Sequence, residues 1–314
     1  MALDELFDGL DSKMDFLNEQ PTKTNNDGIY RVDMSKVKDK KKGYRATVRF
    51  LPNLTREGKV GQLAIEKISH YVKLQEAKEL SGYYDSPKNF NEKCALSELY
   101  YNLTNSKNAI LKEKAKALNY SRKYYSYVLV VEDEQQPDMV GKIMIMQYGK
   151  TIKDKIMSEK NGEISDPCNV FDLKEGKDFV LVVKEIQTGD ITYPDYKMSM
   201  FKPEKTTLPY YFKDKNVFKN IPLDENGGFT AESQNRIKDF LLDREHDIED
   251  FGPKPLTDEQ QAKITEISNL LTGKATQNFR KEEAKSEDFE FEDNFETETA
   301  ESADVDDDDF FNDF

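Results

Sequence analysis

The fold is decided by residues 119–156, which read NYSRKYYSYVLVVEDEQQPDMVGKIMIMQYGKTIKDKI. Tyr124–Val131 is apolar at nearly every position, which predicts a strand buried on both faces at the centre of a sheet. An acidic loop follows over residues 132–140, and Gly141–Tyr148 predicts the next strand. Thr151–Ser158 has the spacing of a helix, so the segment predicts two neighbouring strands followed by a helix.

The flanking sequence supplies further short strands. Tyr44–Leu51 alternates apolar and polar residues, which places Arg49 with Arg45 and Thr47 on the outward face. The other predicted strands are Gln62–Leu74, Phe179–Gln187 and Ile191–Phe201, and the predicted short helices are Leu96–Leu103 and Ala109–Leu118. Several short strands with long connections predict a small, partly open β-barrel with helical insertions, in an α+β protein.

Four regions are predicted along the chain. Residues 1–25 form an amphipathic arm that docks either on its own core or on a neighbour. Residues 26–215 form the barrel core, and residues 216–273 a helical extension packed on it. Its last helix, Asp258–Leu271, starts with a capping box at Thr257 and Gln260. Residues 274–314 lack periodicity and predict a disordered acidic tail.

The net charge of −15 is concentrated at the C-terminal end. Residues 282–314 contain 16 acidic residues and one lysine, so the rest of the chain has no net charge. Residues 31–215 carry more basic than acidic side chains. A basic middle with an acidic tail favours a core that binds polyanions, although a solvated surface with a solubilising tail gives the same asymmetry.

Several protein classes do not fit the sequence. No run of 18 apolar residues predicts a membrane span, and the acidic N-terminus does not resemble a secretory signal. Two cysteines, Cys94 and Cys168, indicate a reducing compartment without a disulfide framework. Gly149-Lys150-Thr151 lacks the earlier glycine of a phosphate-binding loop, and two histidines without a nearby nucleophile argue against a hydrolase. We therefore expect no enzyme activity.

Cations and aromatic rings recur where the predicted strands begin or end. Arg122, Lys123, Tyr124 and Tyr125 stand at one strand entrance, and Tyr148 and Lys150 stand at the end of the next strand. Tyr193, Tyr196 and Lys197 repeat the pattern further along the chain. Single-strand binders combine cations for phosphates with rings for bases, and stacking contributes about 1–3 kcal/mol per base. The pattern predicts single-stranded nucleic-acid binding, although tyrosines near strand ends also cover barrel rims.

The order and spacing of these segments resemble one known family. The chain is similar to the single-stranded DNA-binding (helix-destabilising) proteins of T-even-type bacteriophages. The matching stretches are Ala46–Pro52, Tyr124–Asp133, Gly141–Ile156, Phe179–Gln187 and the Tyr-Asp segment at 193–195. The resemblance is close over residues 43–201, whereas the helical part resembles the family only in outline.

The resemblance implies an OB-fold core, a partly open five-stranded β-barrel, that binds single-stranded DNA without sequence specificity. It also implies self-association along DNA and a role in phage replication, recombination and repair in the cytoplasm of the infected bacterial host. The residues that it and the pattern above place in the DNA cleft are Arg49, Tyr84, Tyr100, Arg122, Lys123, Tyr124, Tyr148, Lys150 and Tyr193.

The acidic tail is expected to recruit replication and recombination proteins and to compete with DNA for the cleft. Its tip interleaves carboxylates with aromatic rings: Asp306, Asp307, Asp308, Asp309, Phe310, Phe311 and Phe314. Such a tip suits both mimicry of DNA and docking on a partner protein.

Two positions depart from the family pattern. The family holds a structural zinc with one histidine and three cysteines, but here only His70 and Cys94 have suitable spacing, and Ser97 occupies the next ligand position. We therefore expect no structural zinc and no other cofactor. Packing of Tyr83, Tyr84 and Phe90 is expected to hold residues 81–93, which we predict to be a loop. The family's basic N-terminal run is replaced by acidic residues, which leaves the degree of cooperativity open.

Two other functions remain open. One is a protein-interaction scaffold whose OB-like domain does not bind DNA. The other is a metal-dependent nuclease, although no acidic pair stands out in so charged a chain.

Overall fold

The computed structural model describes residues 28–37, 39, 42–163, 165–188, 191–208, 224–225 and 230–273. The predictions for the arm (1–25) and for the acidic tail (274–314) lie outside these residues. The division of the chain into four regions stays a prediction.

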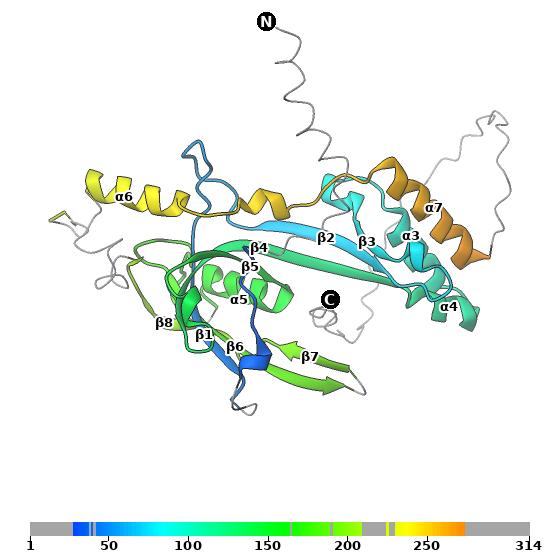
Figure 1. Cartoon of the computed structure of the whole chain (residues 1–314), viewed down its shortest axis with the longest axis horizontal. Helices are drawn as coiled ribbons and strands as arrows, with labels where there is room; N and C mark the ends of the chain where they lie inside the picture. The colour runs from blue at the N-terminus through cyan, green and yellow to red at the C-terminus, as the bar shows by residue number, and fades with distance from the viewer. Residues whose placement is uncertain are drawn as a thin grey trace, which may run out of the picture.

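The described chain is a mixed α+β structure with one antiparallel sheet of eight strands and five α-helices (Figure 1). The strands are β1 (Tyr44–Phe50), β2 (Ile65–Val72), β3 (Gly82–Asp85), β4 (Leu118–Asp133), β5 (Ile143–Tyr148), β6 (Lys177–Thr188), β7 (Ile191–Asp195) and β8 (Met200–Lys205). The helices are α3 (Ala95–Thr104), α4 (Ala109–Ala115), α5 (Lys150–Asn161), α6 (Ala231–Leu242) and α7 (Asp258–Thr272). The strand order is β3-β2-β4-β1-β6-β7, with β5 paired to β4 and β8 paired to β6.

The apolar core lies where β1 is paired on both sides, with β4 on one edge and β6 on the other. Val48, Val128 and Phe179 point into this core and have no exposed surface. Phe50 lies at the centre of this core, because its ring packs edge-on against the rings of Tyr148 and Phe179, each at a centroid distance of 5.8 Å. Burial of these aromatic rings supplies the largest apolar areas in this part of the molecule.

Two extensions leave this core in the same general direction (Figure 1). One is the outer half of β4, which pairs with β2 from Leu118 to Tyr125, while β2 in turn pairs with β3. The other is the hairpin of β6 and β7. Residues 118–123 of β4 pair with β2 only, since β5 begins its pairing at Tyr124. Within the described chain, the second edge of β4 is therefore unpaired along these six residues.

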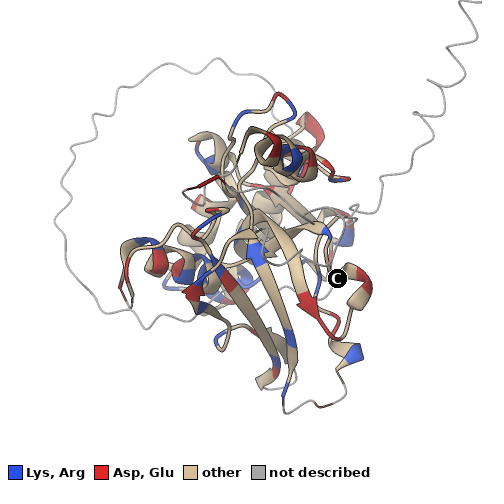
Figure 2. Cartoon of the chain, turned by 90° about the vertical axis from the view of Figure 1, so that its left-hand side faces the viewer, with Lys and Arg blue, Asp and Glu red and all other residues tan. Residues whose placement is uncertain are grey.

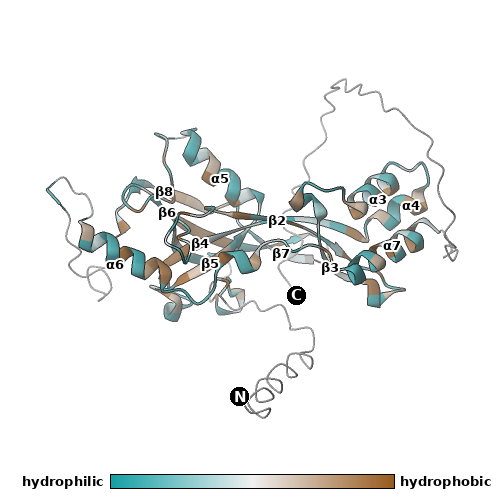
Figure 3. Cartoon of the chain, turned by 90° about the horizontal axis from the view of Figure 1, so that it is seen from above, coloured by the Kyte–Doolittle hydropathy of each residue, from teal (hydrophilic) through white to brown (hydrophobic). Residues whose placement is uncertain are grey.

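Helices cover the outer end of the first extension (Figures 1 and 3). Leu96 and Leu99 of α3, together with Ile267 of α7, pack on Leu118 in a second apolar cluster. Helix α7 begins with the predicted capping box of Thr257 and Gln260, which is confirmed. Helix α6 and the short 3-10 helix Ile248–Phe251 pack on the outer face of β4 and β5 in a third cluster.

Most of the strand and helix predictions are confirmed, and three are corrected. The predicted strand Ile191–Phe201 is two strands, β7 and β8, because residues 196–199 form a turn between them. The predicted helix Ala109–Leu118 ends at Ala115, because β4 already begins at Leu118. Residues 81–93 are not a plain loop, since they contain β3 and the 3-10 helix Pro87–Phe90. Among the helices of the described segments, none is both long and apolar enough to span a membrane.

Candidate nucleic-acid interface

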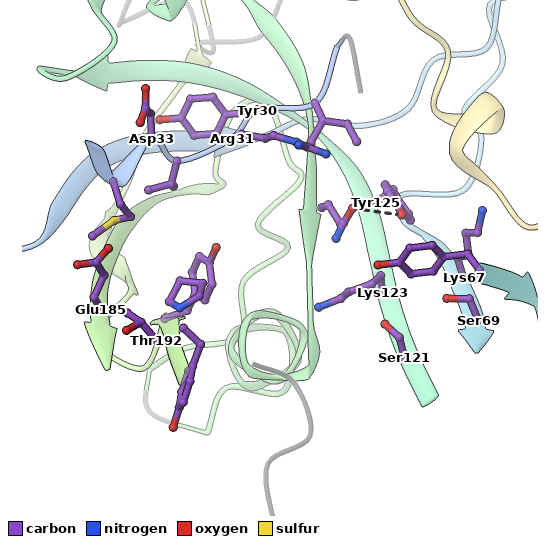
Figure 4. A pocket seen from close by; sticks show the side chains of 18 of the residues that line it. Tyr30, Arg31, Asp33, Lys67, Ser69, Ser121, Lys123, Tyr125, Glu185 and Thr192 are labelled. Atoms are coloured by element: carbon purple, nitrogen blue, oxygen red, sulfur yellow. Dashed lines mark hydrogen bonds between the residues drawn. The ribbon is translucent and has the colours of Figure 1, made fainter. Parts of the chain in front are cut away.

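A cavity of about 540 Å³ lies between the two extensions, and we call it the groove (Figure 4). One wall comes from β2, β3 and β4, and the opposite wall from β6 and β7. A third side is formed by Ile29–Ser35, which we call the strap. The side chains used below are Arg31, Asp33, Lys67, Ser69, Tyr83, Asp85, Ser121, Lys123, Tyr125, Glu185, Tyr193 and Tyr196.

The register of β2 and β4 determines which side chains face the groove. Lys67 lies opposite Lys123, and Ser69 lies opposite Ser121, so two lysines and two hydroxyl groups form adjacent pairs on one face. Tyr125 is the next groove residue toward the core. Residues two apart on a strand share a face, so a hydroxyl (Ser121), a positive charge (Lys123) and an aromatic ring (Tyr125) follow one another along this wall.

Charges of both signs line the groove. The cations are Arg31, Lys67 and Lys123, and the carboxylates are Asp33, Asp85 and Glu185. Lys67 pairs with Asp85 at 3.2 Å, in a position where both side chains are mostly buried. Figure 2 shows the same interspersion of positive and negative residues over the helices and strands. Attraction of a polyanion to the groove therefore depends on individual cations and not on a uniformly positive surface.

Two tyrosines of the groove, Tyr83 and Tyr125, remain un-ionised at physiological pH. Burial and the nearby carboxylate of Asp85 raise the pKa of Tyr125 to about 12, although Arg31 partly offsets them. Burial also raises the pKa of Tyr83 above its ordinary value. A neutral phenol offers a stacking face to a base without repelling the phosphates beside it.

Arg122 and Tyr124 lie on the other face of β4, because they alternate with Ser121 and Lys123. Arg122 pairs with Glu66 at 3.0 Å and donates to the Tyr120 hydroxyl at 3.2 Å. We call these four residues, Glu66, Tyr120, Arg122 and Tyr124, the Arg122 face. This face and the groove meet at the unpaired edge of β4, so a ligand crossing that edge contacts both.

Tyr148 lies beneath Tyr124 and is not itself a surface residue. Their rings stack at a centroid distance of 5.8 Å with an interplanar angle of 23°. The Tyr148 hydroxyl forms a 2.8 Å hydrogen bond with Ser126, and burial raises the pKa of Tyr148 to about 12. Tyr148 therefore supports the Tyr124 ring from below instead of offering its own face.

Arg49 does not face outward, so this prediction is wrong. Its side chain has no exposed surface, donates to Thr206 Oγ1 at 2.8 Å and lies 3.7 Å from Asp178. The second face of β1 is covered by residues 172–176 and 206–208, which the alternation in the sequence does not reveal. Gly176 permits this approach, since a Cβ atom there would lie 2.4 Å from the guanidinium.

Tyr84 is also removed from the surface, which contradicts its predicted place in a cleft. It is 4% exposed, and its hydroxyl donates to the Leu80 carbonyl at 2.7 Å under the helical cover. Its neighbour Tyr83 points to the opposite face of β3 and lines the groove.

Tyr100 and Lys150 lie apart from the groove. Tyr100 is exposed on α3, with its ring edge-on to Tyr101. Lys150 begins α5 and pairs with Asp154 one turn later at 2.9 Å. Of the predicted cleft residues, Lys123 and Tyr193 share the groove, and Arg122 and Tyr124 share the adjoining face. Their contact with DNA stays a prediction.

His70 and Cys94 lie in a buried cluster of polar groups. His70 Nε2 lies 3.3 Å from Cys94 Sγ and 3.2 Å from Ser97 Oγ. Burial disfavours the thiolate, but hydrogen bonds with His70, Ser86 and Ser97 outweigh it and lower the pKa of Cys94 to about 6. One thiol, one imidazole and two serine hydroxyls do not fit a structural zinc site, which uses four cysteine or histidine ligands.

No group of three or more histidine, cysteine or acidic side chains suited to a metal occurs among the described residues. Of the residues expected to hold this loop, only Tyr84 is buried, while Tyr83 and Phe90 are 53% and 40% exposed. The absence of zinc stays a prediction.

The sequence prediction named Tyr125 and Tyr196 in its pattern of cations and rings, but it missed Arg31, Lys67 and Tyr83 of the groove. Alternation along Gln62–Leu74 places Lys67 and Ser69 on one face of the predicted strand. Only the pairing with β4 shows that this face borders the groove. Arg31 carried no such signal, because the strap has no periodicity. The tail residues Asp306–Asp309, Phe310, Phe311 and Phe314 lie outside the described part of the chain.

The comparisons with known proteins agree with a nucleic-acid interface. A family model described as "gp32 DNA binding protein like" matches residues 42–269, which is most of the chain. A comparison with curated proteins finds no match.

Proposed function

The chain belongs to the gp32 DNA-binding protein-like family, and on this basis we propose that it binds single-stranded DNA without sequence specificity. The structural observation that carries the proposal is that Lys67 and Lys123 lie side by side on neighbouring strands, with Tyr83 and Tyr193 around the same groove. Such a surface offers charge to phosphates and flat rings to bases, and reads no base edge in particular.

The proposed path of the strand follows the geometry of β4. Six residues separate Tyr125 from Asn119, which is roughly 20 Å at the rise of a β-strand. A strand lying in the groove meets Lys123 and Tyr193. Where it crosses the unpaired edge of β4 it meets Arg122 and Tyr124. Tyr148 supports the ring of Tyr124 from below. Lys150 and Tyr100 lie away from the groove and stay predicted contacts with DNA.

Titration of labelled oligo(dT) at several salt concentrations tests the proposal. Each phosphate contact to a single strand lowers the slope of log K against log salt by about 0.7, so three contacts give a slope near −2. Mixed-sequence oligonucleotides should bind within a few-fold of the same affinity. Absent binding, or binding that ignores salt, would refute the function.

A protein-interaction scaffold is the second candidate, and the balance of three cations and three carboxylates in the groove favours it. Combined substitution of Arg122, Lys123 and Tyr124 by alanine separates the two functions. A DNA-binding protein loses oligo(dT) affinity by at least tenfold, whereas a scaffold has no such affinity to lose. Incubation of labelled single strands with Mg²⁺ or Mn²⁺ detects a nuclease; intact DNA supports a role without catalysis.

The resemblance to helix-destabilising phage proteins supports finer proposals. We interpret β1, β4, β5, β6 and β8 as an OB-type barrel. The protein would act in replication, recombination and repair in the cytoplasm of an infected bacterium, and would associate with itself along DNA. The acidic tail would recruit partner proteins and compete with DNA. In that case deletion of residues 282–314 raises oligo(dT) affinity, and an unchanged affinity contradicts the competition.

A further inference from the structure

The strap is attached to the barrel at its first residues. The Tyr30 amide donates to the Ile145 carbonyl at 2.8 Å, and the Ile145 amide donates to the Gly28 carbonyl at 2.9 Å. Ile29 and Ile145 thereby form an isolated parallel bridge. The strap begins as a short additional strand beside β5 and then passes along the groove.

A buried hydrogen-bond cluster fixes the next residues of the strap. The hydroxyls of Tyr30 and Tyr44 both donate to the Asp133 carboxylate. Gln136 Nε2 donates to the Arg31 carbonyl at 2.8 Å and to the Tyr44 hydroxyl at 2.8 Å. We call Tyr30, Tyr44, Asp133 and Gln136 the clamp; each is less than 9% exposed. Burial and the bond to Asp133 raise the pKa of Tyr30, so its hydroxyl remains a donor at physiological pH.

Arg31 leaves this fixed backbone with an exposed side chain that lines the groove (Figure 4). Its positive charge is close enough to Tyr125 to oppose the rise in that residue's pKa. Among the described residues no carboxylate lies within 4.0 Å of its guanidinium, whereas Lys67 pairs with Asp85 and Arg122 pairs with Glu66. A phosphate at Arg31 therefore displaces no ion pair with the described part of the chain.

We infer that Arg31 is a phosphate-binding residue of the groove and that the clamp is the device that positions it. The inference rests on the proposed function, since it assumes that the groove takes single-stranded DNA. It extends the interface from the sheet to a segment that precedes β1. The guanidinium suits this task because its planar donors match two phosphate oxygens at once.

The first test compares Arg31→Ala with the wild-type chain in oligo(dT) titrations over a range of salt. We expect affinity at low salt to fall about tenfold, as for loss of one charge-assisted contact. The salt slope should become shallower by about 0.7. Lys42→Ala is the matched control, because it removes one exposed cation that pairs with Asp39, and neither of these residues lines the groove.

The outcomes separate the inference from the function on which it rests. A wild-type protein that binds with a steep slope, and an Arg31→Ala variant with the same slope, overturn the inference alone. A wild-type protein without salt-dependent binding overturns both. An equal loss in Lys42→Ala shows a general charge effect and also overturns the inference.

The second test is a double-mutant cycle between the clamp and Arg31. Tyr30→Phe removes one hydrogen bond to Asp133 and keeps the ring in place. If the clamp acts through Arg31, Tyr30→Phe weakens oligo(dT) binding several-fold in the wild-type chain but adds no loss in Arg31→Ala. An equal loss in both backgrounds shows that the clamp shapes the groove in another way and contradicts the positioning role.

Discussion

From Tyr125 to Val130, β4 is buried on both faces, whereas from Asn119 to Tyr124 every side chain is half-buried or exposed. The first stretch, which belongs to the strands that we interpret as a barrel and which we call the barrel half, pairs with β1 and β5. The second, the outer half, pairs with β2 along its length, meets β5 at Tyr124 and borders the groove. One continuous strand therefore has two roles: its buried part belongs to the core, and its more exposed part borders the groove. Substitutions in or beside the barrel half should change stability, and those beside the outer half should change binding.

The largest expected effect lies next to the barrel half. Arg49→Ala removes a buried guanidinium and leaves the Asp178 carboxylate, which is 1% exposed, beside the partly exposed Lys202. Loss of one partner of a buried ion pair costs about 3–5 kcal/mol. Urea unfolding should show this loss in the free energy of unfolding. Arg45→Ala, exposed on the same strand, should change it by less than about 0.5 kcal/mol. Equal losses in the two variants would remove the distinction between buried and exposed arginines.

The next effect concerns the groove. Tyr193→Ala should weaken oligo(dT) binding by about 1–3 kcal/mol, the contribution of one stacked base. The free energy of unfolding should stay within about 0.5 kcal/mol of the wild type, because Tyr193 is only half-buried. Tyr101→Ala is the control, since Tyr101 is exposed on α3 outside the groove. Fluorescence anisotropy and urea unfolding on the same preparations compare the two quantities. A loss of stability as large as the loss of binding would assign Tyr193 to packing.

The sequence predicted the barrel half better than the outer half, for a physical reason. Tyr124–Val131 has an apolar run that admits few other structures, so its central position followed directly. The outer half alternates, and alternation shows that residues share a face without showing what covers it. Arg49 and Tyr84 were placed at the surface because their covers, residues 172–176 with 206–208 and the helices α3 and α7, come from distant parts of the chain.

The groove depended even more on distant contacts. Lys123 and Tyr193 were found by composition, because cations beside rings are a local signal. Lys67 required the register between β2 and β4, which residues 46 or more positions apart determine. Arg31 required the clamp, which joins Tyr30 to Asp133 across 103 positions. No local pattern encodes such a contact.

The smallest expected effect tests whether the two faces of the outer half act together. Glu66 neutralises Arg122 in a pair whose side chains are 44% and 50% exposed, and such pairs contribute about 0.2–1 kcal/mol. Glu66→Gln should therefore lower stability by no more than that amount. If a DNA strand crosses the unpaired edge of β4, the released Arg122 meets a phosphate, and oligo(dT) affinity at low salt rises by up to about fivefold.

The same charge change at Glu76, which is exposed beyond the end of β2, is the control for net charge. Equal gains in Glu66→Gln and Glu76→Gln would show a long-range charge effect only. No gain in Glu66→Gln would confine the strand to the groove, and the contact of Arg122 with DNA would then be wrong. A gain specific to Glu66→Gln that disappears in an Arg122→Ala background supports a path across the edge, because only the released guanidinium links the two substitutions.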